Sequence, residues 1–191
     1  DEWGGSLHNR LRFPLAVVDA VAAAVKAHAK SDFILGYRFS PEEPGEQGIT
    51  MAETFALIDE LVQKPLQYLH VSLWDFYKHA RRGADTNRTR MELLHERIAG
   101  KLPLIGVGNL YTGSDIAKAF HTGWAEFIAL GKTVMINPDL ADLLRDNRDA
   151  DIQTDLDPAR ADHYRLPDAL WQRCLTNSPW LPPVKGMERQ I

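Results

Sequence analysis

Short apolar runs alternate with stretches of helical periodicity along most of the chain. The Ala- and Val-rich stretch 9–29 carries valines at the spacing of one helix face, and Phe33–Tyr37 follows it as a compact apolar run. Pro14 is acceptable in such a helix only near its start, because proline lacks the backbone N–H of a helix interior. The pattern therefore predicts a first helix over 9–29 and a buried strand over 33–38.

The same alternation of strand and helix repeats three more times. Thr50 followed three residues later by Glu53 is a capping box that predicts the start of a second helix. Further strands are expected over 67–72, 103–107 and 126–130, and further helices over 91–100, 114–122 and 138–145. Four strands, each followed by a helix at a spacing of about thirty residues, are typical of an α/β fold built from parallel βα units.

Composition limits the classes of protein that fit this pattern. The 191 residues include 45% hydrophobic and 25% charged residues, as in an ordinary globular domain, but a complete (β/α)8 barrel takes about 250 residues. A net charge of −4 without a basic block argues against nucleic-acid binding, and no apolar run approaches the roughly 18 residues of a membrane span. Cys174 is the single cysteine, which excludes an intrachain disulfide and fits a reducing, cytoplasmic location. No metal-ligand spacing is present.

Two glycine-containing segments follow the third and fourth expected strands. Gly108-Asn109 comes directly after one, and Gly131-Lys132 directly after the other. Glycine lets backbone N–H groups approach an anion closely, a lysine adds a full charge, and the last two loops of a (β/α)8 barrel often form a phosphate site. The alternative is that both glycines only end their strands.

The ends of the first two expected strands carry further candidates. Arg38 stands at the end of the first strand, where a barrel side chain points into the site, although a surface arginine in a salt bridge is the alternative. His70 and Ser72 alternate on the second strand, where a lone histidine is more often a packing residue than a catalytic one. The aromatic segment 74–77 either shapes the rim of a substrate site or packs.

Two motifs give the chain a family resemblance. Residues 1–13, Asp-Glu-Trp-Gly-Gly-Ser-Leu-His-Asn-Arg-Leu-Arg-Phe, resemble the D-x-[YW]-G-G-S-x-x-N-R-x-R-F segment of the Old Yellow Enzyme family of flavin-dependent NAD(P)H oxidoreductases. The Gly-Asn, Gly-Lys and Asn137–Leu140 segments resemble the end of the same family's barrel. The resemblance covers 1–145. It departs from the usual pattern at His8, where the family has Glu, and at Lys132, where it has Arg.

The resemblance implies a fold, a cofactor and a set of site residues. In that family the opening motif follows the fourth strand of an FMN-binding (β/α)8 (TIM) barrel. Residues 1–145 would therefore be strands five to eight, the C-terminal half, with 146–191 as an extension packed on the barrel. By resemblance, Gly108, Asn109, Gly131 and Lys132 hold the FMN phosphate, and Arg38 contacts the pyrimidine edge of the flavin. NADH or NADPH would be the reductant, and a small electrophilic molecule the acceptor. The family's substrate-binding His/Asn pair and proton-donating Tyr precede the first residue here, so no catalytic residue is assigned.

Two functions of different class remain open. The first is part of an FMN-dependent NAD(P)H oxidoreductase of the ene-reductase type. The second is a non-catalytic half-barrel that binds FMN or phosphate, or self-associates. Half a barrel leaves two strand edges unpaired, and such edges template pairing with another chain. We therefore expect association with a missing N-terminal half or with a second copy, unless the tail 146–191 folds over the gap. Neither nucleic acid nor membrane is an expected partner.

Overall fold

The computed structural model describes residues 2–30 and 32–188, so that Asp1 of the opening motif lies outside the described residues. The chain divides into two compact units. Unit 1 comprises Asp1–Gly108 and Thr122–Ile128, and unit 2 comprises Asn109–His121 and Ala129–Ile191. The expected division of the sequence after residue 145 stays a prediction.

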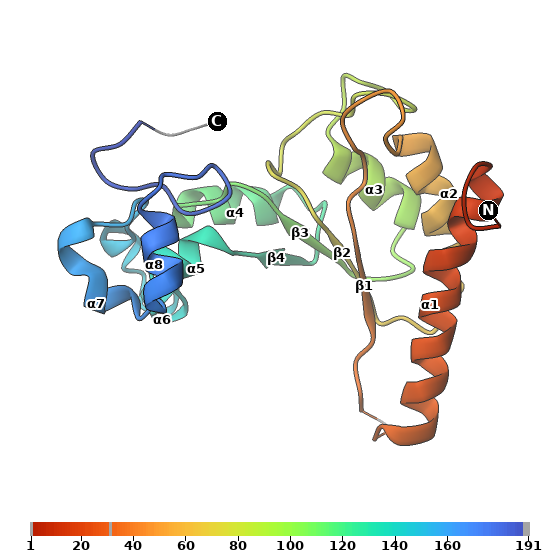
Figure 1. Ribbon diagram of the computed structural model, residues 1–191, viewed down its shortest axis with the longest axis horizontal. Helices are drawn as coiled ribbons and strands as arrows, with labels where there is room; N and C mark the ends of the chain where they lie inside the picture. The colour runs from red at the N-terminus through yellow and green to blue at the C-terminus, as the bar shows by residue number, and fades with distance from the viewer. Residues whose placement is uncertain (1, 31, 189–191) are drawn as a thin grey trace. The chain divides into compact units, whose positions relative to one another are not determined.

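Four short strands form one sheet in sequence order (Figure 1). They are β1 (Gly36–Phe39), β2 (Tyr68–Val71), β3 (Leu104–Val107) and β4 (Phe127–Ala129). The pairs β1–β2 and β2–β3 are parallel, with Arg38 opposite His70 and His70 opposite Ile105. The predicted α/β architecture with a four-stranded parallel sheet is therefore confirmed.

The first strand starts later than its apolar run predicted. Phe33 and Ile34 precede β1 and are 55% and 68% exposed. The Leu35 backbone N–H donates to the Gln67 side chain at 2.6 Å. Ladder pairing cannot extend further back along the neighbouring segment, because Pro65 has no N–H to donate. The first residues of the apolar run thus lie outside the sheet and are largely exposed to solvent.

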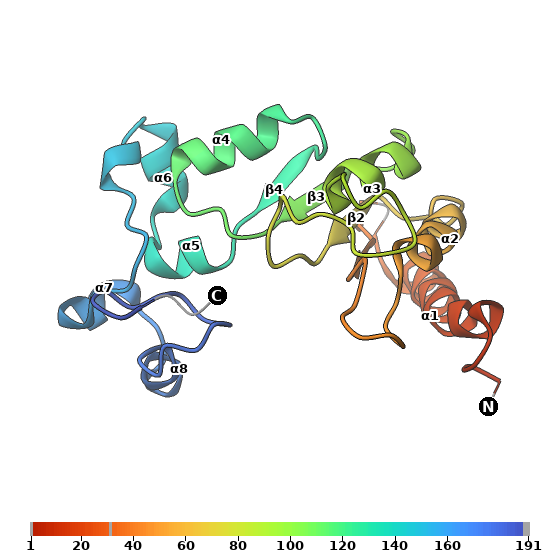
Figure 2. The same ribbon diagram turned by 90° about the horizontal axis from the view of Figure 1, so that it is seen from above.

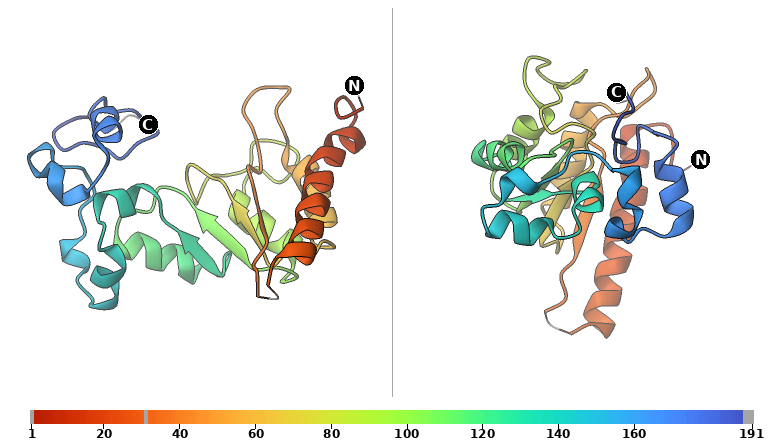
Figure 3. Two further views of the ribbon diagram at one scale, coloured as in Figure 1. Left: turned by 60° about the horizontal axis from the view of Figure 1, so that its bottom comes forward. Right: turned by 90° about the vertical axis from the view of Figure 1, so that its left-hand side faces the viewer.

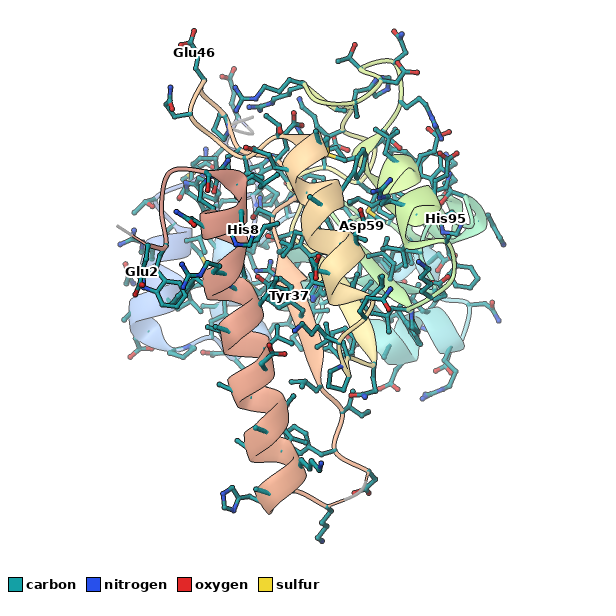
Figure 4. All side chains as sticks on the ribbon, turned by 90° about the vertical axis from the view of Figure 1, so that its right-hand side faces the viewer. Glu2, His8, Tyr37, Glu46, Asp59 and His95 are labelled. Atoms are coloured by element: carbon teal, nitrogen blue, oxygen red, sulfur yellow. The ribbon has the colours of Figure 1, made fainter. Side chains whose placement is uncertain are left out.

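Three helices cover one face of the strands in unit 1 (Figures 1 and 4). These are α1 (Leu7–His28), α2 (Met51–Leu61) and α3 (Arg90–Ile98), and α2 packs against both others. The predicted capping box at Thr50 is confirmed, and Arg97 Nε donates to Asp59 Oδ1 at 2.8 Å to join α3 to α2. Pro14 lies inside α1, seven residues after Leu7, which is further from the helix start than the sequence led us to expect. The C-terminal end of α1 projects past the strands (Figures 3 and 4).

The opening motif has a structural role at the start of α1. Ser6 caps the helix by accepting from the Asn9 backbone N–H, and the Asn9 side chain donates back to the Gly4 carbonyl at 3.1 Å. Arg10 donates from Nε to the Gly5 carbonyl and pairs through Nη2 with Glu53 at the start of α2. This hydrogen bond is the main reason that the pKa of Glu53 lies below its ordinary value. The motif therefore fixes the first helix and joins it to the second.

Unit 2 is built from short helices (Figure 2). They are α4 (Gly113–His121), α5 (Lys132–Ile136), α6 (Leu140–Arg145), α7 (Ala161–Tyr164) and α8 (Asp168–Cys174), with 3-10 turns at Asp149–Asp151 and Pro158–Arg160. The hydrophobic pattern of the sequence did not predict α5. One core of the unit gathers Ile136, Leu156, Tyr164 and Cys174, all buried.

In the described part of the chain, no helix is long and apolar enough to cross a lipid bilayer.

Candidate functional site

The strands of unit 1 present a polar group on the face opposite their buried side chains. Leu69 and Val71 of β2 are fully buried, so the residue between them, His70, points to the opposite face. Arg38 lies beside His70 in the register of β1 and β2. Its Nη2 donates to Ser72 Oγ at 2.9 Å. The structure therefore brings together three residues that the sequence suggested separately, and we call Arg38, His70 and Ser72 the Arg38 cluster.

The surroundings of His70 favour its uncharged form. Burial lowers the pKa of its imidazole below the ordinary value, and the positive charge of Arg38 lowers it further. Its Nε2 atom is buried and, among the described residues, has no hydrogen-bond partner. Buried polar atoms are normally satisfied by protein, water or a ligand. The cluster therefore holds one permanent cation beside an imidazole ring with an unsatisfied nitrogen.

A buried carboxylate fixes the loops that follow β1 and β2. The Glu42 side chain is wholly buried and accepts from the backbone N–H groups of Arg81 and Arg82 at 2.8–3.0 Å. It also pairs with Arg90 Nε at 2.7 Å, and the Arg90 side chain is only 8% exposed. We call this the Glu42 clamp. No local pattern indicates the clamp, because the partners of Glu42 lie 39–48 positions away in the sequence.

The aromatic residues after β2 do not form one common surface. Phe76 is completely buried and stacks on Trp124 at 6.2 Å between ring centroids. Tyr77 packs edge-on against both rings and is 41% exposed, and Trp74 is 38% exposed. Phe76 is therefore a core residue, and the suggestion that it shapes a substrate rim is wrong.

In unit 2 the Asn109–Leu110 segment lies next to the start of α5. Thr133 Oγ1 donates to the Leu110 carbonyl at 2.5 Å, and the Thr133 side chain is buried. This bond joins the start of α5 to the segment that begins at Asn109, 23 positions away. Asn109 is exposed and adopts a left-handed backbone with φ of 48°. Thr133 was not singled out in the sequence, since a threonine after Gly-Lys carries no distinctive pattern.

Gly131 and Lys132 form the N-terminal end of α5. Gly131 is exposed, and a Cβ built on it would meet no atom within 4 Å, so the space beside its backbone is open. Lys132 is half-buried, and burial lowers the pKa of its ammonium group. Its Nζ donates to the Pro179 carbonyl at 2.8 Å. An accessible glycine backbone beside a lysine is a set of donors that suits a phosphate group.

Asn137 of the Asn-Pro-Asp-Leu motif is structural. Its buried amide donates to the carbonyls of Thr133 and Gln153 at 3.0 and 2.8 Å, and its Oδ1 accepts from the Gln153 backbone N–H. These bonds connect α5 to the chain beyond α6. The motif therefore stabilises the helix that begins with the Gly131–Lys132 segment.

Gly108 is buried at the end of β3 with φ of 138°. A Cβ there would lie 2.5–2.8 Å from backbone atoms of Asp75 and Phe76. Glycine is thus required by the close approach of two chain segments, whether or not a ligand is present. In the described residues, no group of three or more His, Cys, Asp and Glu side chains is arranged to hold a metal ion.

The sequence matches the model of one known protein family. The model of the NADH:flavin oxidoreductase / NADH oxidase family matches residues 1–151. The chain belongs to this family. The match confirms the resemblance drawn from the opening and closing motifs.

Several known proteins are similar over most of this chain. The probable NADH-dependent flavin oxidoreductase YqiG of Bacillus subtilis is 43% identical over 95% of the chain, which covers 49% of that protein. The NADH:acrylate oxidoreductase of Vibrio harveyi is 32% identical over 90% of the chain and 17% of its own length. The structure of morphinone reductase in complex with tetrahydroNAD matches with a TM-score of 0.58 and 26% identity, over 87% of this chain and 43% of that one. The chain thus spans half or less of these relatives.

Proposed function

We propose that this family member is part of an FMN-dependent NAD(P)H oxidoreductase of the ene-reductase type. In this proposal β1–β4 correspond to strands five to eight of a (β/α)8 barrel. The observation that carries it is the junction of the Asn109–Leu110 and Gly131–Lys132 segments through Thr133, in a chain whose family is named for flavin and NADH. The names of relatives that reduce acrylate and morphinone support an electrophilic small molecule as the acceptor.

The residues divide into two roles. Gly108, Asn109, Gly131 and Lys132 would hold the FMN phosphate, through backbone N–H groups and one ammonium. Arg38 would place its permanent charge beside the flavin ring and favour the anionic reduced form. FMN, when bound, supplies hydride transfer between NADH or NADPH and the acceptor. Lys132 also has to exchange its hydrogen bond to Pro179 for one to the phosphate.

The Lys132→Ala substitution is expected to weaken FMN binding about tenfold, because a hydrogen bond to a charged group contributes roughly 1.5 kcal/mol or more. The effect is measured by titration with FMN, followed by flavin fluorescence. The titration uses the full-length protein, by which we mean this chain together with the N-terminal half-barrel of the proposal. Lys118→Ala, which removes an exposed lysine of α4 in the same unit, is the matched control. Equal affinity in the Lys132 and Lys118 variants would contradict the phosphate site.

The proposal also includes a protein partner at the open edge of β1. β1 is the terminal strand of the sheet, and the nearby end of α1 and the Phe33–Leu35 segment form a groove of about 490 Å³. Its lining includes Ala22, Val25 and Pro65. At about 25 cal/mol per Å², a few hundred Å² of exposed apolar surface costs several kcal/mol. An N-terminal half-barrel or a second copy of the chain would cover this surface.

The 191-residue chain is therefore expected to sediment as an assembly larger than 21.5 kDa at high concentration. Ile34→Lys should shift it toward the monomer, since a charge would enter the apolar segment before β1. Val134→Lys, at an exposed apolar position of α5 in unit 2, should leave the assembly unchanged. If the unaltered chain is a well-folded monomer, the proposed association through the edge of β1 is wrong. The cytoplasmic location suggested by the single cysteine stays a prediction.

A further inference from the structure

The Arg38 cluster contains an atom that its own surroundings do not explain. His70 Nε2 is buried, and no donor or acceptor in the described residues reaches it. Its neighbour across the strands, Arg38, is instead bonded to Ser72. On β3 the residue in register with His70 is Ile105, which has no polar side chain to offer. The missing partner must therefore come from outside the sheet.

The chemistry of the cluster limits what that partner is. Arg38 offers several N–H donors and a fixed positive charge, which favours a planar group rich in acceptors. Burial and the charge of Arg38 lower the pKa of the His70 ring, which favours the neutral form. A neutral imidazole donates from one nitrogen and accepts at the other. The pyrimidine portion of a flavin carries both carbonyl acceptors and a ring N–H donor, so either tautomer of His70 finds a complement there.

We propose that His70 is a further cofactor-binding residue, whose Nε2 forms a hydrogen bond with the polar edge of the flavin ring beside Arg38. This inference rests on the proposed function. It assigns His70 to the ring and leaves the phosphate to Lys132. A histidine that looked like a packing residue in the sequence thereby becomes part of the binding surface, on the same sheet face as Arg38 and next to it in register.

The test compares three variants of the full-length protein in FMN titrations. His70→Leu keeps a similar volume but removes both ring nitrogens, and it should weaken FMN binding about fivefold, as expected for one net hydrogen bond. His70→Gln places an amide near the former position of Nε2 and should stay within about twofold of the unaltered protein. Tyr68→Phe removes a hydroxyl from the preceding residue on the same face of β2 and serves as the control, with no expected change.

A second measurement needs no substitution. The ¹⁵N chemical shift of His70 Nε2 in the unaltered protein should move when FMN is added, and should not move when inorganic phosphate is added. A shift that is unchanged by FMN would overturn the inference even if His70→Leu fails to fold.

Other outcomes separate the two proposals. If the unaltered protein binds FMN and His70→Leu binds it equally well, the role of His70 is wrong while the proposed function stands. Equal losses in His70→Leu and His70→Gln would show a packing role and would also overturn it. If the unaltered full-length protein binds no FMN at all, the proposed function itself fails.

Discussion

The Glu42→Gln substitution is expected to lower the free energy of unfolding by about 3 kcal/mol or more. The carboxylate is wholly buried and carries the only charge that the structure places against Arg90 Nε, at 2.7 Å, among the described residues. Glutamine is almost the same size, but it leaves a buried guanidinium without an opposite charge. Removing one partner of a buried pair typically costs about 3–5 kcal/mol. The two backbone N–H groups of Arg81 and Arg82 would also lose a charged acceptor.

Urea unfolding of the variant, followed by circular dichroism, measures this loss. Glu46→Gln is the matched control, because Glu46 belongs to the same loop and its side chain extends outward, away from the helices (Figure 4). It is expected to change the unfolding free energy by less than about 0.5 kcal/mol. Similar midpoints for the Glu42 and Glu46 variants would show that the clamp contributes little. Since the clamp holds the loops after β1 and β2, the Glu42 variant should also become more sensitive to proteolysis between 75 and 90.

The Gly108→Ala substitution is expected to destabilise unit 1 by about 3 kcal/mol. The new Cβ would stand 2.5 Å from the Phe76 backbone nitrogen, and neither backbone segment can move away cheaply. The φ of 138° adds strain for any residue with a side chain, in the range of about 1–3 kcal/mol. The hydrogen bond from the Phe76 N–H to the Gly108 carbonyl, at 3.2 Å, would be disturbed as well.

Gly131→Ala provides the contrast at the second glycine of the proposed phosphate site. Its φ is −108° and the space around its Cβ is open, so the fold should tolerate the methyl group. We expect an unfolding free energy within about 0.5 kcal/mol of the original, together with weaker FMN binding if phosphate approaches this backbone. Thermal unfolding and FMN titration of both variants check the pair. A stable Gly108→Ala protein would show that Asp75 and Phe76 can shift away from β3.

Local signals in the sequence predicted most of the secondary structure. The capping box at Thr50 depends on residues three positions apart, and it is present as expected. One error arose from a distant segment, and another from local helix propensity. Phe33 and Ile34 are apolar enough for a strand, but the ladder stops at Leu35, whose carbonyl accepts from the Gln67 N–H, because Pro65 has no N–H to donate. The helix α5 was missed because Thr133, Val134 and Ile136 are β-branched residues, which have low helix propensity, in a five-residue segment.

The candidate site was only partly visible in the sequence. Arg38, His70 and Ser72 were each noticed, and the strand register then brought them together. Gly108 proved to be required by chain packing, independently of any ligand. Thr133 and Asn137 hold the Gly131–Lys132 segment in place through hydrogen bonds to residues 16–23 positions away.

The opening and closing motifs were enough to indicate the family, and hydrophobic periodicity and caps were enough to predict the order of strands and helices. These are short-range properties that neighbouring residues fix. The folded chain was needed to show that Glu42 clamps two loops and that His70 has an unsatisfied buried nitrogen beside Arg38. Burial and pairing depend on which distant segments meet. The sequence around a glutamate or a histidine is the same whether its side chain is exposed to water, forms a salt bridge or lies beside a cofactor.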